Sequence, residues 1–434
     1  MNESSSTLDA AIDCLQRGDL ADAIAGFRQS ISQQPDNARA WHLCGIAHAR
    51  QNDLESAAEC FTTAARLAPT NPNYHYNLGL AHQSLKQFDQ SIAAYRRAIE
   101  LKPDLVEAQT NLGNSLNESG QAAESIDHFR KMIELLPNES VGFYNLANVL
   151  QDNGNFAESI TQFRRAIELD PDFSSARENL GRALSDVERY DEATEVWQQW
   201  LDHDPENAVA RHMLASITGQ GTPERCDDDY VRHTFDQDFA NCYETQLARI
   251  QYRVPELIGR SIELLDTPFC DAQVLDAGCG TGLCAGVLRP LAERLIGVDL
   301  SADMLAQAER LACYDELHED ELTHFLDHCD RRFDLIVSGD TLCYFGRLDD
   351  VLSKAAQCLS PDGVLVFSVE QHDNEDQSFW LQPHGRYRHA RPYIEQTIKQ
   401  AGLTIVDLDT QTLRKERGRD VSGFIVTATA NSNR

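Results

Sequence analysis

The sequence lacks several features that would assign it to a familiar class. Its 12 cysteines include no Cys-x-x-Cys pair, and no histidine pairs with cysteines or carboxylates at ligand spacing, so we expect no metal site. The chain opens without the basic and apolar regions of a secretory signal. No run of apolar residues approaches the roughly 20 that a membrane span needs. We therefore expect a cytoplasmic protein with free thiols and no membrane association.

Basic residues are also scarce. Lysine and arginine number 38 against 69 aspartate and glutamate residues, and the formal net charge is −31. Because an acidic protein repels phosphate backbones, we do not expect nucleic acid as a partner. The run from Arg414 to Arg419 is the strongest basic exception, and we interpret it as a solvated hairpin between two late strands.

What the first half contains is a strict period of 34 residues. Prolines recur at this interval, and a large aromatic residue lies eight positions before each proline. Small residues recur four and sixteen positions before each aromatic, where they let two antiparallel helices approach, and the proline ends the second helix. The period therefore predicts repeated helix pairs. The prolines are Pro35, Pro69, Pro103, Pro137, Pro171 and Pro205, and the aromatics are Phe27, Phe61, Tyr95, Phe129, Phe163 and Trp197.

This pattern resembles the tetratricopeptide repeat, with six complete copies over about residues 4–207 and a capping helix over 208–217. The resemblance implies an all-α superhelix over residues 1–218, whose concave groove binds a protein or peptide.

Four asparagines recur at the repeat spacing: Asn77, Asn111, Asn145 and Asn179. In the consensus geometry they face the groove, where amide side chains can pair with the backbone of an extended peptide. The arrangement is similar to the asparagine ladder of the O-linked N-acetylglucosamine transferase family. The alternative is that asparagine is simply common at this position of the repeat. Acidic residues beside the ladder favour a basic peptide.

The composition changes at residues 219–229, where two glycines, a proline and an acidic run predict a linker. We expect two lead-in helices over 230–268, the earlier one covering a pocket. From 270 to 430 strand and helix patterns alternate, which predicts an α/β, doubly wound and mostly parallel sheet with its ligand at the strand carboxyl ends.

The stretch 274–282 joins a predicted strand to a glycine-rich loop with Gly278, Gly280 and Gly282, and Asp299 closes the next strand. This combination predicts a nucleotide pocket. A dinucleotide fold prefers Gly-x-Gly-x-x-Gly and would place a pyrophosphate near Asp276, whose carboxylate would repel it. That carboxylate suits the ammonium group of a methionine moiety, so the loop favours S-adenosylmethionine over NAD.

The segment 230–434 as a whole resembles the class I S-adenosylmethionine-dependent methyltransferases, within a Rossmann-like fold. The resemblance implies that the loop and Asp276 hold the methionine part and that Asp299 binds the ribose. It places Leu300, Met304 and either Asp320 or Glu321 at the adenine. The fourth-strand motif, residues 338–342, would lie near the transferring methyl group.

The acceptor is less defined. The fourth strand lacks the (Asp/Asn)-Pro-Pro-(Tyr/Phe) motif of amino-group methylation, and no Pro-Cys motif for cytosine C5 appears. Asp340, Tyr344 and His389 are the candidate catalytic groups on the acceptor side. Three hypotheses follow: a methyltransferase whose repeats recruit a protein or peptide, a small-molecule methyltransferase whose repeats act as a tether, and an interaction scaffold with a vestigial methyltransferase fold.

Overall fold

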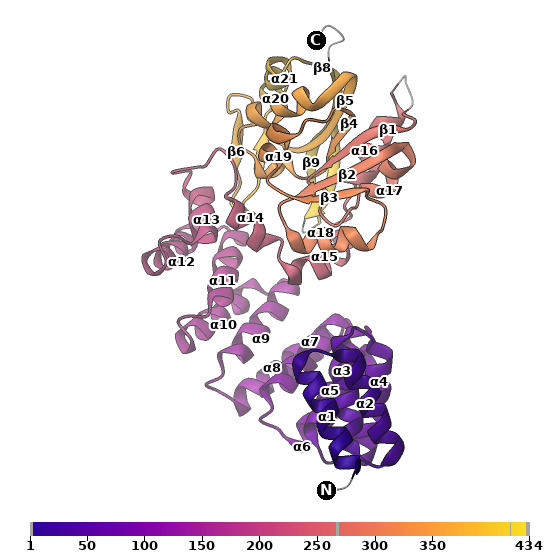
Figure 1. Cartoon of the computed structure of the whole chain (residues 1–434). Helices are drawn as coiled ribbons and strands as arrows, with labels where there is room; N and C mark the ends of the chain where they lie inside the picture. Colours follow the sequence, from indigo (N-terminus) through magenta and orange to yellow (C-terminus); the bar gives the residue numbers. More distant parts are fainter. Residues whose placement is uncertain (1–2, 266–268, 417, 431–434) are drawn as a thin grey trace. The chain divides into compact units, whose positions relative to one another are not determined.

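The computed structural model describes residues 3–265, 269–416 and 418–430. The contacts within the chain divide it into two compact units, Met1–Glu188 and Arg189–Arg434 (Figure 1). Three parts of the predicted domains lie outside the described residues. They are the start of the repeat domain at 1–2, the end of the lead-in helices at 266–268 and the end of the α/β domain at 431–434. By contacts, the second helix of the last repeat and the capping helix fall into the same unit as the α/β domain.

The first unit consists of antiparallel helices in the predicted phase. A Cβ atom on Gly79 would lie 2.5 Å from Cε1 of Tyr95, so the small residue of each pair makes room for the aromatic ring of its partner. The expected all-α repeat array is confirmed. Its helices are α1 Glu3–Arg17, α2 Leu20–Gln33, α3 Ala38–Arg50, α4 Leu54–Leu67, α5 Pro72–Ser84, α6 Phe88–Leu101, α7 Val106–Glu118, α8 Ala122–Leu135, α9 Ser140–Asp152, α10 Phe156–Leu169 and α11 Ser174–Asp186.

The second unit begins with α12 (Tyr190–His203) and the capping helix α13 (Ala208–Thr218). His212 of α13 is bonded through Nε2 to the carbonyl oxygen of Gly385 at 2.9 Å, and its ring stacks on Tyr230 with centroids 4.0 Å apart. Three helices follow instead of the two we predicted: α14 Asp228–Thr234, α15 Gln237–Arg249 and α16 Val254–Glu263.

The α/β domain is built on a nine-stranded sheet with the path β3-β2-β1-β4-β5-β7-β6. The pairs β1–β2, β1–β4, β2–β3 and β4–β5 are parallel, as predicted, whereas β9 adds to β5 antiparallel and β8 pairs with β9. The strands are β1 Ala272–Ala277, β2 Ala292–Asp299, β3 Glu316–Glu319, β4 Phe333–Ser338, β5 Leu359–Gln371, β6 Phe379–Leu381, β7 Tyr387–His389, β8 Leu403–Glu416 and β9 Arg419–Ala430.

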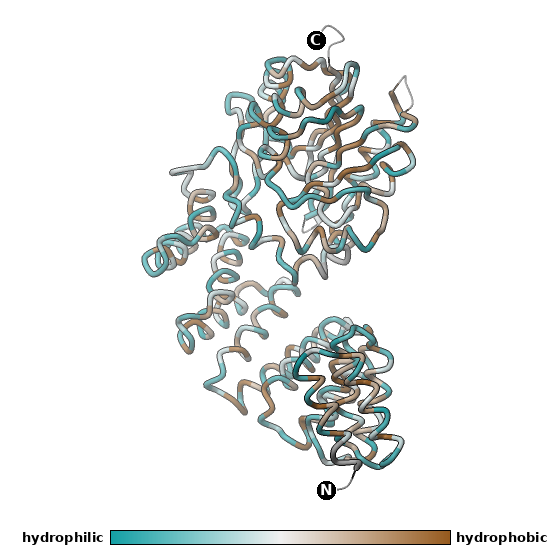
Figure 2. The backbone as a smooth tube through the Cα atoms, in the orientation of Figure 1, coloured by the Kyte–Doolittle hydropathy of each residue, from teal (hydrophilic) through white to brown (hydrophobic). Residues whose placement is uncertain are grey.

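The core lies along the central strands, where Figure 2 shows hydrophobic stretches in brown. Val274, Leu335 and Val366, on three adjacent strands, are fully buried. The helix predicted over 283–291 is only one turn of α-helix followed by a 3-10 turn, because Pro290 lies within it. The remaining helices are α17 Ala285–Leu288, η1 Arg289–Leu291, α18 Ala302–Arg310, α19 Leu322–His328, η2 Leu342–Tyr344, α20 Asp349–Cys358 and α21 Arg391–Gln400.

None of the helices in the described part of the chain combines the length and the apolar character of a membrane span.

Candidate active site

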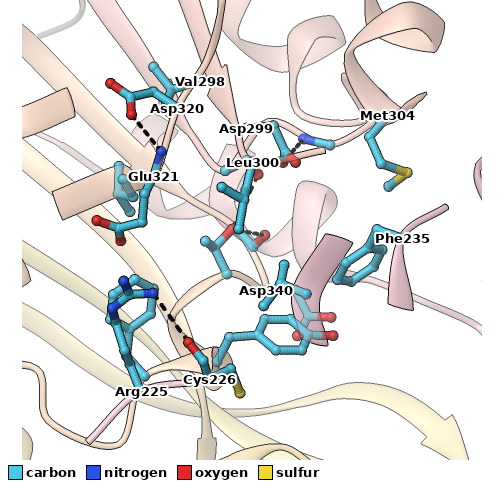
Figure 3. A pocket seen from close by; sticks show the side chains of 18 of the residues that line it. Arg225, Cys226, Phe235, Val298, Asp299, Leu300, Met304, Asp320, Glu321 and Asp340 are labelled. Atoms are coloured by element: carbon cyan, nitrogen blue, oxygen red, sulfur yellow. Dashed lines mark hydrogen bonds between the residues drawn. The ribbon is translucent and has the colours of Figure 1, made fainter. Parts of the chain in front are cut away.

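A cavity opens at the carboxyl ends of β1, β2 and β4, the edge at which doubly wound folds bind their ligands. Its empty volume is about 720 Å³, part of which is open to solvent. Figure 3 shows Asp299 and Met304 on one side of this cavity and Arg225 and Cys226 on the other. The lining residues are Arg225, Cys226, Val231, Phe235, Tyr243, Gly278, Gly280, Val298, Asp299, Leu300, Met304, Asp320, Glu321, Leu322, Gly339, Asp340, Thr341, Tyr344 and Phe345.

The glycine loop after β1 is held against the end of β2. The amides of Gly278 and Cys279 both donate to the carbonyl oxygen of Val298, at 2.8 and 2.9 Å. The φ angles are +80° at Gly278 and +54° at Gly280, in the region that favours glycine. A Cβ atom on Gly278 would lie 2.0 Å from Oγ1 of Thr341. The loop backbone therefore forms one wall of the cavity, as the motif predicts.

Asp299 ends β2 with its carboxylate fixed by backbone amides. One oxygen accepts a hydrogen bond from the amide of Gly280 at 2.8 Å and the other from the amide of Ser301 at 2.9 Å. Burial raises the pKa of Asp299, and these amide hydrogen bonds offset part of that effect. Each carboxylate oxygen has a second lone pair, so the group can also accept hydrogen bonds from a ligand's hydroxyls.

The predicted adenine-side residues all line the cavity. Leu300 and Met304 are apolar, and Met304 is buried. The carboxylate of Asp320 is bonded to Nδ1 of His324 at 2.8 Å, whereas Glu321 accepts the amide of His324 at the start of α19. Oε1 of Glu321 is buried and has no hydrogen-bond partner among the described residues. Of the two acids, Glu321 therefore has an oxygen available to a ligand.

Asp276 and Gly282 are not among the residues that line the cavity, and their role in cofactor binding stays a prediction. The carboxylate of Asp276 is buried and accepts a hydrogen bond from the hydroxyl of Tyr314 at 2.7 Å, and burial raises its pKa to about 7. A Cβ atom on Gly282 would lie 2.7 Å from Leu311 and 3.1 Å from Tyr314. Both positions thus belong to the side of the loop that packs against Tyr314, a residue that the sequence pattern did not single out.

Asp340 lines the cavity after β4 in a strained conformation with φ of +57°. Its amide donates to Oγ of Ser368 at 2.8 Å. Its carboxylate lies 3.3 Å from Nη1 of Arg386 and 3.5 Å from Nη1 of Arg414, and its side chain is 8% exposed. The carboxylate of Asp340 is therefore paired with two guanidinium groups at the end of β4.

Asp340, Glu370, Arg386 and Arg414 form what we call the buried ion cluster. Glu370 and Arg414 pair directly and are 0% and 1% exposed. Burial alone would raise the pKa of Glu370, but Arg414 and the other nearby cations outweigh it and hold that pKa well below its usual range. Arg414 lies in β8 and is 1% exposed, so our prediction that its basic run is solvated is wrong at this residue.

The other two catalytic candidates differ in their placement. Tyr344 lines the cavity with its ring 5.7 Å from the guanidinium carbon of Arg386, and burial raises the pKa of its hydroxyl. His389 is 0% exposed and does not line the cavity. Its Nε2 bonds the carbonyl oxygen of Phe345 at 2.8 Å, and burial lowers its pKa to about 4. His389 therefore lies in the core, where its Nε2 is bonded to a backbone carbonyl, and a catalytic role for it stays a prediction.

The segment that we predicted as a linker contributes to the cavity wall. Arg225 forms an antiparallel bridge with Phe345, and the amide of Cys226 donates to the carbonyl oxygen of Tyr344 at 2.8 Å. Sequence reasoning missed these residues because a bridge between positions 225 and 345 has no local signal.

Aromatic residues of the predicted lead-in region cover the same side. Phe235 lies before α15 and packs edge-on against Tyr344 with centroids 5.5 Å apart. The hydroxyl of Ser301, which caps α18, donates to the carbonyl oxygen of Phe235 at 2.6 Å. The spacing of Phe235, Phe239 and Tyr243 at every fourth residue was the available signal for this cover.

In the first unit, the asparagine ladder is linked from repeat to repeat. Three of the asparagines are half-buried, and each bonds a side chain that lies 35 positions earlier; Asn145 is buried. The pairs are Asn77 with His42 at 2.6 Å, Asn111 with Tyr76 at 3.4 Å and Asn179 with Tyr144 at 3.3 Å. Asn179 donates in addition to Oδ1 of Asn148 at 2.9 Å. Since an amide offers two donor hydrogens and two acceptor lone pairs, the amide oxygens of Asn111 and Asn179 keep capacity for a ligand.

Comparison with known protein families supports this division. A family model described as "Methyltransferase domain" matches residues 275–367. A model described as "Cytochrome c-type biogenesis protein H TPR domain" matches residues 5–140, and one described as "Tetratricopeptide repeat" matches residues 144–208.

Similar curated proteins include a malonyl-acyl-carrier-protein O-methyltransferase of Buchnera aphidicola, 33% identical over 105 residues, which are 24% of this chain and 42% of that protein. Protein arginine N-methyltransferase 1 of Schizosaccharomyces pombe is 30% identical over 197 residues, 38% of this chain and 56% of that protein. The chain thus spans about half the length of these relatives. Among solved structures, magnesium protoporphyrin IX methyltransferase of Synechocystis PCC 6803 with bound SAH is 16% identical with a TM-score of 0.38, over 47% of this chain and 100% of that one.

Proposed function

We propose that this chain, which joins tetratricopeptide repeats to a methyltransferase domain, transfers a methyl group from S-adenosylmethionine to an acceptor in the cavity. The observation that carries the proposal is the carboxylate of Asp299, fixed by two amides at the end of β2 beside the glycine loop. A carboxylate at this place accepts the two hydroxyls of a ribose.

The charge of the lining fits this cofactor better than a dinucleotide. Four carboxylates line the cavity, those of Asp299, Asp320, Glu321 and Asp340, and the lining holds one arginine, Arg225. Such a lining suits a cationic cofactor and disfavours a pyrophosphate. The carboxylate of Asp276 is not part of this lining and accepts a hydrogen bond from Tyr314.

Each part of the lining has a physical role in the proposal. Asp299 orients the ribose, Glu321 offers its buried oxygen to the adenine, and Met304 packs on the ring. Phe235 and Tyr344 exclude water from the methyl group. When bound, the cofactor supplies an electrophilic methyl, so the protein mainly positions the acceptor behind it.

We favour a protein-borne acceptor. Two relatives, a methyltransferase of a malonyl-acyl carrier protein and a protein arginine methyltransferase, differ in the acceptor atom, but both are named for a protein substrate. The repeats with their asparagine ladder would recruit that protein, and the acidic groove surface favours a basic segment. The alternative is a small-molecule acceptor, with the repeats as a tether to a complex.

Calorimetry with S-adenosylhomocysteine tests the cofactor site. We expect Asp299→Asn to weaken binding about 10- to 100-fold, because hydrogen bonds to a charged group are lost. The matched control is Asp303→Asn, an exposed acid on α18, which should bind like the wild type. Absence of binding to the wild type would favour the vestigial scaffold, and equal affinities for the two variants would exclude Asp299 as the ribose ligand.

Methyl transfer from labelled cofactor into a basic peptide library tests recruitment. We expect the double variant Asn111→Ala/Asn145→Ala to raise KM for the peptide and to leave cofactor affinity unchanged. Asn138→Ala, in an exposed turn of the same unit, is the control. An unchanged KM in the double variant would favour the tether.

A further inference from the structure

A second site lies in the repeat unit, away from the glycine loop. Cys44 and His48 are four residues apart on α3, and Cys60 lies on α4. One potential ligand atom from each residue lies within 4.8 Å of the others, and all three residues are buried. Within the described ranges, this is the one group of three or more cysteine, histidine or acidic residues that meets this distance.

The repeat period supplies internal comparisons for the two thiols. In the four repeats that follow, leucine stands at the position of Cys44, and no cysteine stands at the position of Cys60. The two departures from the pattern occur in the same repeat and meet in space. The equivalents of Cys44 are Leu78, Leu112, Leu146 and Leu180, and those of Cys60 are Ala94, His128, Gln162 and Val196.

The next repeat shows what the histidine does without the thiols. There His82 stands at the position of His48 and bonds Oε1 of Gln87 through Nδ1 at 2.8 Å. In the cysteine-containing repeat, Nδ1 of His48 bonds a carboxylate oxygen of Asp53 at 2.9 Å. Between these two repeats, the residue that bonds the histidine Nδ1 is an acid in the repeat with Cys44 and Cys60 and an amide in the next one. A carboxylate behind an imidazole fixes its orientation and raises its basicity, an arrangement that metal-binding histidines commonly have.

We propose that Cys44, His48 and Cys60 bind one thiophilic cation, zinc(II) or copper(I), with Asp53 as the positioning residue for the imidazole. Two thiolates and an imidazole are ligands that both ions prefer. Binding converts both thiols to thiolates, and their two protons pass to the buffer. We did not predict this site from the sequence because the ligands lie on two helices and have no motif spacing.

The place of the site indicates its effect on the fold. Cys44 and Cys60 belong to the same core cluster as Leu15 and Phe27 of the first repeat. A cation that binds the folded state alone would therefore raise the unfolding temperature of the first unit.

The test uses the full chain, reduced and freed of metal, in two separate titrations with zinc(II) and copper(I) against a chromophoric chelator. We expect one equivalent of at least one ion to bind, with release of about two protons for the two thiols. Cys44→Leu and Cys60→Ala each insert the residue of the next repeat, so both variants should fold. We expect each to lower the affinity at least about 100-fold, and Asp53→Asn to lower it about 10- to 100-fold.

Cys358→Ala, a buried thiol of the other unit, is the matched control and should bind like the wild type. Circular dichroism of every variant separates lost ligands from lost fold. Failure of both ions to compete with a chelator of micromolar affinity would overturn the proposal, as would equal affinities of wild type, Cys44→Leu and Cys60→Ala. A one-equivalent site that only the ligand variants lose would support it.

Discussion

Replacing Arg414 by methionine tests whether this residue belongs to the core, although its basic run lies at the hairpin between β8 and β9. Arg414 is 1% exposed and pairs with Glu370, which is 0% exposed. Methionine fills a similar volume but removes the charge. The variant therefore leaves a fully buried carboxylate without its nearest cation.

The expected loss of stability follows from what remains around Glu370. Breaking a buried ion pair by removing one partner costs about 3–5 kcal/mol. Arg386 and Arg388 stay at 3.4 and 3.5 Å from Glu370, so we expect about 3 kcal/mol. For a unit of this size, that loss lowers the unfolding temperature by roughly 6–12 °C.

The pH dependence of stability provides a second, independent test of the Arg414–Glu370 pair. In the wild type, the pKa of Glu370 is held below its ordinary value of 4.5. Its pair therefore stabilises the fold above pH 4.5, and this contribution is lost as the pH falls through the lowered pKa. Without Arg414 the pKa of Glu370 should rise, so the deficit of the variant should shrink as the pH falls through that higher pKa.

Thermal and denaturant unfolding of the two single variants measures the difference. Arg419→Met is the control, because Arg419 is exposed and belongs to the same basic run; it should change stability by less than about 0.5 kcal/mol. The double variant Arg414→Met/Glu370→Gln should recover part of the loss. If Arg414→Met were as stable as Arg419→Met, the buried ion cluster would not exist as described.

Three further substitutions test the site. Gly278→Ala should lose affinity for S-adenosylhomocysteine and unfold earlier, because its Cβ would lie 2.0 Å from Thr341 at a φ of +80°; wild-type binding would contradict the tight loop. Asp276 has a pKa of about 7 in the fold against an ordinary 3.8, so wild-type stability should fall as the pH rises between these values, and Asp276→Asn should flatten that slope in unfolding measured at pH 4 to 8. His389 has a pKa of about 4 in the fold against an ordinary value of 6.5, so wild-type stability should fall as the pH drops from 6.5 to 4. His389→Gln should reduce this loss of stability at acidic pH. If the substitution instead changed how the rate of methyl transfer depends on acidic pH, His389 would be assigned to catalysis.

The parts of the fold that follow from local pattern were predictable. The 34-residue period fixes the phase of the helix pairs, because each repeat packs on its neighbours with the same small and aromatic residues. The glycine loop and Asp299 were also predictable as cavity residues, since the motif is contiguous and both lie at the carboxyl ends of adjacent parallel strands.

The parts that depend on long-range pairing were not. Arg414 reaches Glu370 across 44 positions of sequence. The basic run does lie at the hairpin between β8 and β9, but the solvated interpretation was wrong at Arg414, which is 1% exposed. The wall formed by Arg225 requires a bridge to Phe345. Asp276 belongs to the motif, yet its side chain meets Tyr314 from another part of the chain. In each case the position of the residue depends on a partner distant in the sequence, and no local pattern identifies that partner.

The conformation of Asp340 links the site to the role of the repeats. A positive φ at a residue other than glycine costs about 1–2 kcal/mol, and Asp340 keeps it while Ser368 holds its amide and two arginines hold its carboxylate. The carboxylate is thus held within the buried ion cluster. His389 lies in the core, and the proposed reaction needs no general base when the acceptor atom is already deprotonated. The rate then rests on how well that acceptor is positioned, which is the contribution that a recruiting repeat array would make.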